Sequence, residues 1–176
     1  MQTFFALVRG INVGGKNLVP MAELRALVAA LGHADVETYI ASGNVVFRSA
    51  AKEAEVVAGL ERALEAKYGR ALPVVVRSRD ELVATVAKNP YPDVEPSRLL
   101  VMFLSHKPKA AAVARLDPHR SPGDTCVLVG RDLYAHCPNG FARTRLTVDY
   151  FDRTLGVTAT GRNWRTVNTL AEWPRR

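Results

Sequence analysis

The residues of this sequence that are best placed to do chemistry form a glycine-rich segment, GINVGGKN, at residues 10–17. The order glycine, four residues, glycine and lysine is the spacing of a P-loop, in which backbone N–H groups and a lysine surround phosphate oxygens. Asn17 stands where a P-loop has the Ser or Thr that binds magnesium, and no apolar run ends in the aspartate that holds this metal. We therefore do not expect a Walker-type NTPase.

Two weaker interpretations of the segment remain open. Gly10, Gly14 and Gly15 permit a concave arrangement of backbone N–H groups, which could bind an anion beside Lys16. Alternatively, the glycines only supply the positive φ angles that a connection from a strand to a helix requires.

Two further segments carry polar residues in suggestive positions. Ser42, Gly43 and Asn44 form the triplet SGN, which is typical of a tight hairpin turn but could also contact a ligand. The segment GRNWRTVN, residues 161–168, places arginines near a predicted helix start, where N–H groups and cations favour an anion. Asn163 could equally be an N-cap there.

Helical spacing makes Trp164 a core residue by prediction, although an exposed tryptophan could stack on a nucleic-acid base. Arg162 and Arg165 flank the apolar stripe and are expected to be exposed. The complete set of candidate anion-binding residues is Arg9, Gly10, Asn12, Gly14, Gly15, Lys16, Asn17, Ser42, Asn44, Arg162, Asn163 and Arg165.

The sequence contains no recognisable catalytic or metal-binding pattern. Its four histidines lack metal-ligand spacing, and there is no nucleophile elbow or C-x-x-C pair. Cys126 and Cys137 lie on the two arms of a predicted hairpin without facing each other, so we expect free thiols. No metal and no cofactor are predicted, and an enzyme is the less favoured class.

The pattern of apolar residues predicts the same order of elements twice. The first half should contain strands at about 3–9, 35–41, 44–48 and 72–78 and helices at about 20–32, 52–68 and 79–90. After a Pro-rich linker at 91–97, the second half should contain strands at about 98–105, 125–129, 132–137 and 157–160 and helices at about 109–116, 143–155 and from 163.

This order predicts an α+β fold of two tandem ferredoxin-like repeats, each βαββαβ plus a helix, with antiparallel sheets and the helices packed on one face. The predicted domains are 1–90 and 98–176. We further expect the Gly10–Asn17 loop and the Ser42–Asn44 turn to lie at opposite ends of the first sheet, and so not to meet within one repeat.

Composition and charge narrow the classes of partner. The chain is 48% hydrophobic, which suits a packed core, and no apolar run approaches the length of a membrane span. With no signal peptide visible, a cytoplasmic protein is expected and a membrane partner is not. The net charge is +7, and residues 141–176 hold seven basic but only three acidic side chains. This basic end favours a nucleotide or nucleic-acid partner, although it could be a solvated surface.

The segments LVRGINVGGKNLVPMAELRALVAALG, VETYIASGNVVF and TRLTVDYFDRTLGVTATGRNWRTVNTL together resemble the bacterial family called domain of unknown function 1697. The resemblance implies a compact α+β protein of two ferredoxin-like repeats. It implies no activity, and therefore no catalytic residue. Gly161 departs from the pattern of the family, whose members often have threonine before the R-N-W residues.

Three functions follow as hypotheses. The leading one is a non-catalytic binding protein whose glycine loop and basic C-terminal repeat engage a phosphate-bearing ligand. The second is an enzyme on a small phosphorylated or nucleotide substrate, with Lys16, Asn44 and Arg162 as electrostatic stabilisers. The third is a protein-interaction platform without a ligand.

Overall fold

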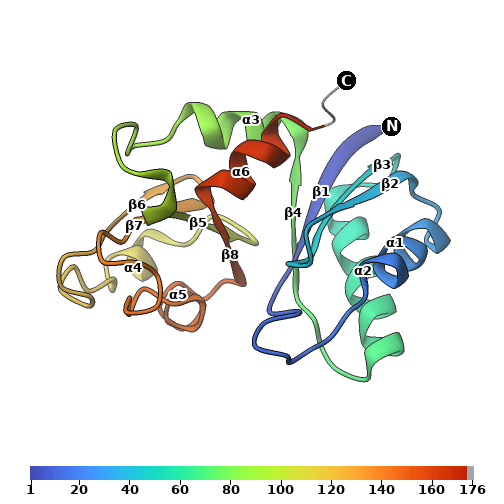
Figure 1. The fold of residues 1–176 in the computed structure, drawn as a ribbon, viewed down its shortest axis with the longest axis horizontal. Coiled ribbons are helices and arrows are strands. Elements are labelled where there is room, and N and C mark those ends of the chain that lie inside the picture. Colours follow the sequence, from blue (N-terminus) through green and yellow to red (C-terminus); the bar gives the residue numbers. More distant parts are fainter. Residues whose placement is uncertain (174–176) are drawn as a thin grey trace. The chain divides into compact units, whose positions relative to one another are not determined.

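The computed structural model describes residues 1–173, and it divides the chain into two compact units, Met1–Glu81 and Leu82–Arg176. Two of the basic residues at the C-terminal end, Arg175 and Arg176, lie outside the described residues. The boundary falls inside a helix, α3 (Arg79–Ala87), earlier than the linker at 91–97 that the prolines suggested. Figure 1 shows the course of the chain.

The first unit contains one four-stranded antiparallel sheet with strand order β2-β3-β1-β4. Its elements in chain order are β1 (Gln2–Val8), α1 (Met21–Ala30), β2 (Ala34–Tyr39), β3 (Asn44–Ser49), α2 (Glu53–Tyr68) and β4 (Val74–Ser78). β1 lies centrally between β3 and β4, and the residues of its continuous apolar run, Phe4–Val8, are all buried.

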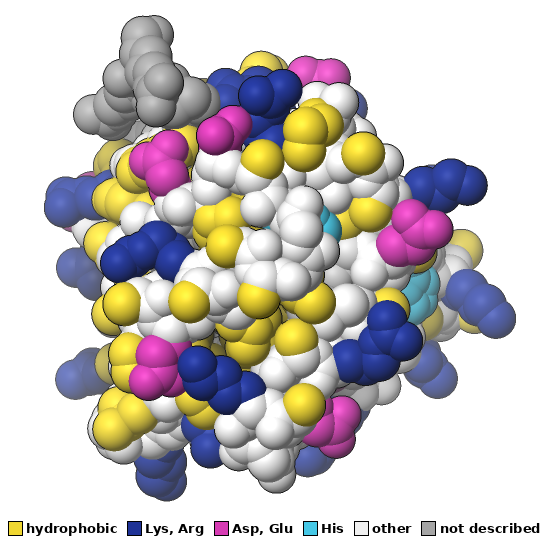
Figure 2. Space-filling view, turned by 90° about the vertical axis from the view of Figure 1, so that its right-hand side faces the viewer, with side chains coloured by type: hydrophobic (Ala, Val, Ile, Leu, Met, Phe, Trp, Pro, Cys, Tyr) yellow, Lys and Arg dark blue, Asp and Glu magenta, His cyan; other side chains and the backbone are white. Residues whose placement is uncertain are grey.

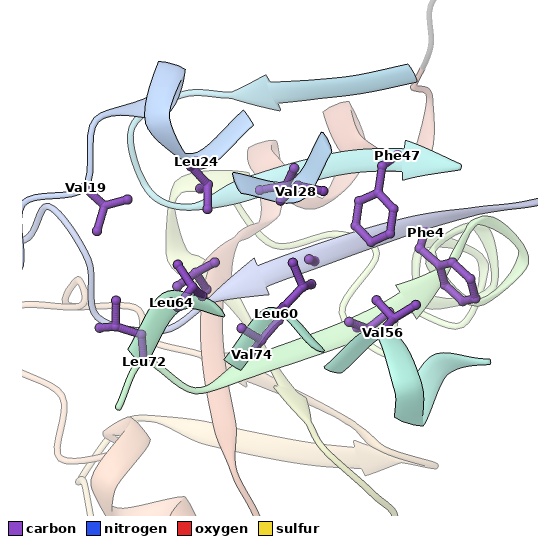
Figure 3. Packing of buried hydrophobic residues seen from close by; sticks show 14 of the residues in the cluster. Phe4, Val19, Leu24, Val28, Phe47, Val56, Leu60, Leu64, Leu72 and Val74 are labelled. Atoms are coloured by element: carbon purple, nitrogen blue, oxygen red, sulfur yellow. The ribbon is translucent and has the colours of Figure 1, made fainter. Parts of the chain in front are cut away.

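Both long helices of this unit pack against one face of the sheet (Figure 3). Every second residue of β1 belongs to this core, and α1 and α2 each contribute one apolar stripe. The residues that form it include Phe4, Ala6, Val8, Leu24, Val28, Val45, Phe47, Val56, Leu60, Leu64, Val74 and Val76.

The second unit repeats the strand order, as β6-β7-β5-β8. Its elements after α3 are a short 3-10 helix η1 (Pro96–Arg98), then β5 (Leu99–Leu104), α4 (Ala110–Val113), β6 (Thr125–Val129), β7 (Asp132–His136), α5 (Val148–Leu155), β8 (Ala159–Asn163) and α6 (Trp164–Ala171). Cys126 pairs with Ala135 across the β6–β7 hairpin, so Cys126 and Cys137 do not face each other, as predicted.

The helices of the second unit do not all pack on one face, which corrects the predicted arrangement. Alternate residues of β7, Leu133 and Ala135, share a core with α5. Tyr134 lies between them in sequence and therefore points to the opposite face. Its hydroxyl donates to the carbonyl of Thr85 in α3 at 2.6 Å, and its ring lies 6.4 Å from that of Trp164 in α6. A helix that directly follows an outer strand can fold back over either face.

Two predicted helices are much shorter than expected. The helix predicted at 109–116 covers only Ala110–Val113. The helix predicted at 143–155 begins only at Val148, because the Thr147 side chain caps it by accepting a hydrogen bond from the Tyr150 N–H. It ends, as predicted, at Gly156 with a left-handed φ of 66°.

Candidate functional site

The glycine-rich segment folds as a small hairpin rather than as a P-loop. The Lys16 N–H donates to the carbonyl of Val13 at 3.0 Å, and the Asn12 N–H donates to the carbonyl of Asn17 at 3.1 Å. Gly14 and Gly15 form the two-residue turn with φ angles of 58° and 72°, both in the region that a primed hairpin turn demands. A Cβ atom would meet nothing at either glycine, so conformation alone explains them.

The position of α1 separates this hairpin from a helix start. In a P-loop the phosphates lie on the first turn of the following helix, but α1 begins only at Met21 and has Pro20 at its N-cap position. The structure therefore agrees with the sequence in excluding a Walker-type loop. What remains is a short hydrogen-bonded hairpin that carries Lys16 as an exposed cation.

Asn12 joins this hairpin to a second loop. Its side-chain Nδ2 donates to the carbonyls of Val19 at 2.9 Å and Ala41 at 2.7 Å, and its Oδ1 accepts from the Val19 N–H at 2.8 Å. The residue has a φ of 55°, a left-handed conformation that asparagine tolerates better than most residues. One side chain thus fixes both ends of the glycine segment against the turn after β2.

The turn after β2 is held by its own polar side chain. Asn44 is fully buried, and its Nδ2 donates to the carbonyl of Tyr39 at 3.0 Å and to the hydroxyl of Ser42 at 2.9 Å. The carbonyl of Gly43 accepts from the Val8 N–H at 2.8 Å. A Cβ atom on Gly43 would lie 2.9 Å from the Ile11 side chain, so a larger residue does not fit there.

The expectation that these two loops lie at opposite ends of the sheet was wrong. β1 and β2 are each antiparallel to β3, so they run parallel to each other, and the connections that leave their C-terminal ends share one end of the sheet. We call this region, residues 9–20 and 39–44, the loop end of the first sheet. It contains nine of the twelve candidate residues.

The loop end carries three exposed aliphatic side chains that the sequence argument did not single out. Val13, Leu18 and Ile40 are 66%, 64% and 50% exposed, and each adjoins a residue of the Asn12 hydrogen-bond network in sequence. Ile40 also has a φ of 48°, which is a rare and strained conformation for a β-branched residue. Strained, exposed apolar residues are more typical of a binding surface than of a fold requirement.

The charge of the loop end has one sign. Its two segments contain the basic residues Arg9 and Lys16 and no aspartate or glutamate. Elsewhere the signs mix: the face of the first unit that carries α1 and α2 shows basic and acidic side chains scattered together (Figure 2). Arg9 is half-buried, and its backbone N–H donates to the carbonyl of Pro73 at 2.9 Å.

The other three candidate residues belong to the second unit, at the junction of β8 and α6. Arg162 is buried, contrary to the expectation that it is exposed. Its Nη1 donates to the Thr160 hydroxyl at 2.9 Å and to the Gly161 carbonyl at 2.7 Å. Burial lowers the pKa of its guanidinium to about 10, because the charged form loses its hydration.

The remaining residues of the junction fit structural roles. Asn163 is the N-cap of α6, and its Oδ1 accepts from the Thr166 N–H at 2.9 Å. Trp164 is half-buried and Arg165 is exposed. Arg165 is thus the exposed basic candidate in this unit.

The potential metal ligands and the two cysteines lie within residues 1–173. No group of three or more potential ligand side chains is placed to hold a metal ion there. Cys126 and Cys137 are free thiols, and burial raises the pKa of both. Within the same part of the chain, no helix has the length and apolar character to cross a membrane.

The described residues define an α+β protein with two four-stranded antiparallel sheets and six α-helices. The chain belongs to the family described as "Protein of unknown function (DUF1697)", whose model matches residues 1–134. The matched range includes the whole loop end but stops before the Arg162–Thr166 segment.

Among solved structures, the chain is similar to a conserved bacterial protein, SP0830 from Streptococcus pneumoniae. The two are 26% identical, the alignment covers 97% of each chain, and the TM-score is 0.77. No curated protein matches the chain.

Proposed function

We propose that this protein is a cytoplasmic binding protein for a phosphate-bearing ligand, a nucleotide or a nucleic acid, and that the loop end of the first sheet is its binding surface. The observation that carries the proposal is Lys16. Among the described residues, no carboxylate forms an ion pair with it, and both segments of the loop end lack acidic residues. Because Lys16 has no carboxylate partner in the described residues, no ion pair has to be broken before its ammonium group contacts a phosphate.

We also propose that the two units are tandem ferredoxin-like repeats. The identical strand orders, β2-β3-β1-β4 and β6-β7-β5-β8, support this assignment. In such an arrangement the second repeat contributes the basic end of the chain, where Arg165 is an exposed basic side chain.

The proposal is tested by a thermal-shift screen of the full chain at low salt, with nucleotides, polyphosphate, short RNA and short DNA. A ligand at a hundred times its dissociation constant should stabilise the fold by about 2.7 kcal/mol. Lys16→Ala should reduce the shift. The matched control, Lys88→Ala, removes another exposed lysine and should leave the shift unchanged. If no compound shifts the wild type, the proposal is wrong.

Salt dependence then separates the two ligand classes. A nucleic acid that contacts several basic side chains should lose affinity steeply as salt rises, whereas a single nucleotide should show a shallow slope.

A second function, docking of a partner protein, is favoured by the exposed Val13, Leu18 and Ile40. Exposed aliphatic side chains on a rigid frame suit a protein interface, which buries apolar groups at its centre. This function predicts that Val13→Ser together with Leu18→Ser abolishes capture of the partner and leaves thermal shifts by nucleotides or polyphosphate absent in both proteins.

A further inference from the structure

The second unit contains a cavity of about 280 Å³ that the proposed function does not use. It lies between the segment that follows α4 and the start of the edge strand β6. We propose that this cavity binds a small organic cation with a short apolar body, such as a primary alkylammonium. The proposal concerns the second unit alone and does not depend on the loop end of the first sheet.

The walls of the cavity define the body of the ligand. Leu116, Pro118 and Leu146 provide apolar surface, and Leu146 is buried. The volume lies at the lower limit of ordinary ligand sites, which favours a small molecule over a nucleotide or a polymer. Aliphatic walls without an aromatic ring favour an alkyl chain over a planar base.

A buried hydroxyl fixes one polar corner of the cavity. Ser121 is 94% buried; its Oγ donates to Asp124 Oδ2 at 2.6 Å and accepts from the Arg145 N–H at 3.0 Å. Because a carboxylate offers about four acceptor positions, Asp124 keeps capacity for a donor from a ligand.

The charges that line the cavity define the head of the ligand. Asp117 and Asp124 both line it, and within residues 1–173 neither carboxylate forms an ion pair. Asp117 is bonded through Oδ1 only to the His119 N–H, at 2.8 Å. The lining is therefore negative in a chain of net charge +7, and it contains no lysine or arginine.

Arg120 lies between these two aspartates in the sequence but does not line the cavity. The guanidinium of Arg120 stacks on the ring of Tyr150 at 4.6 Å, and its Nε donates to the Arg145 carbonyl at 3.4 Å. The Tyr150 hydroxyl in turn accepts from the Asp117 N–H at 2.9 Å. The two carboxylates are thus left to a cation from solution. Asp117 is exposed, whereas Asp124 is half-buried and is screened less by water.

The experiment is an NMR titration of the 15N-labelled full chain with three probes of equal size and different charge: n-butylammonium chloride, 1-butanol and sodium butyrate, at one ionic strength. Butylammonium should shift the amide signals of the non-proline residues among 116–126 and that of Leu146. It should bind at least about tenfold more tightly than 1-butanol, since hydrogen bonds to a charged group contribute more than this factor. Butyrate should leave these signals unmoved.

Charge-neutral variants locate the interaction. Asp117→Asn keeps the shape of an exposed side chain and should weaken butylammonium binding several-fold, while Asp93→Asn, a matched change at another exposed position, should not. Lys16→Ala should bind butylammonium as the wild type does. Equal affinity for butylammonium and 1-butanol, shifts confined to other residues, or equal binding by Asp117→Asn would each overturn the proposal.

Discussion

Asn12 is the residue on which the loop end of the first sheet depends most. It makes three side-chain hydrogen bonds, to Val19 and Ala41, and holds a left-handed φ. Asn12→Ala removes all three bonds and places alanine at a positive φ, so it should lower the free energy of unfolding by about 2–4 kcal/mol. Urea denaturation measures this loss.

The control for that prediction is Asn17→Ala. Asn17 also has a positive φ, but its side chain makes one exposed hydrogen bond, to the carbonyl of Gly10. It should cost about half as much. A loss below about 0.5 kcal/mol for Asn12→Ala would show that Asn12 does not fix the two loops, because surface substitutions alone have effects of that size.

For Ile40 we predict the opposite effect, because its backbone conformation lowers the stability of the fold. Isoleucine at a φ of 48° is strained, and half of its surface is exposed. Ile40→Asn should raise the free energy of unfolding by about 1 kcal/mol, because asparagine tolerates the left-handed region. The same denaturation experiment checks it. A destabilised variant would mean that packing of the isoleucine outweighs its strain.

His33 predicts a dependence on pH. Its ring stacks on Phe47 at 4.7 Å, and burial lowers its pKa below the ordinary value of 6.5. The unfolded chain therefore binds the proton more readily, so His33 stabilises the fold above pH 6.5 and loses this contribution as the pH falls toward its folded pKa. His33→Gln should show a smaller fall in stability between pH 7.5 and pH 5. An identical fall in both proteins would refute the assignment.

At the scale of elements, substitutions of Asn163 at the junction of β8 and α6 can distinguish a helix N-cap from a residue that contacts the ligand. Asn163 was a candidate binding residue, but its Oδ1 caps α6. Asn163→Ala should cost about 1 kcal/mol of stability, and Asn163→Asp should restore most of it, because aspartate is an equally good N-cap. Thermal unfolding compares the two. Loss of phosphate-ligand binding in a stable Asn163→Asp protein would instead indicate a contact to the ligand.

The elements themselves could be predicted from the sequence where a local signal was strong. The apolar run of β1, the stripes of α1 and α2 and the glycine that ends α5 all gave the right element. The burial of Arg162 could not be predicted, because it depends on which face of β8 meets α6. The clustering of the two loops was missed because strand direction, not sequence distance, decides which connections share an end.

The exposed aliphatic residues show how far the candidate site could be predicted from the sequence. Val13 and Leu18 flank the sequence GGKN of the glycine-rich segment and are exposed. A sequence alone does not show whether a single apolar residue is buried. Ile40 is harder still, since its strain depends on a backbone angle. The sequence could identify Gly10–Lys16 as unusual, yet only the hydrogen bonds separate a small hairpin from a phosphate loop.

At the scale of the whole molecule, the described residues form two sheets with the same strand order. The loop end of the first sheet carries two basic residues, Arg9 and Lys16, and no acidic residue. The description of the family supplies no catalytic role, so the proposed function rests on the loop end as a proposed anion-binding surface. If phosphate binds at the loop end, the shift of charge toward residues 141–176 is a secondary contribution. If it binds elsewhere, that basic end becomes the primary surface.

The measurement that tests this most directly is an NMR titration of the 15N-labelled full chain with tripolyphosphate at low salt, repeated with Lys16→Ala. The account predicts that the amide signals of residues 10–17 and 42–44 shift together, and that Lys16→Ala weakens the binding by about tenfold, the size of one charge-assisted contact. Shifts that avoid these two segments, or an affinity that Lys16→Ala leaves unchanged, would contradict it.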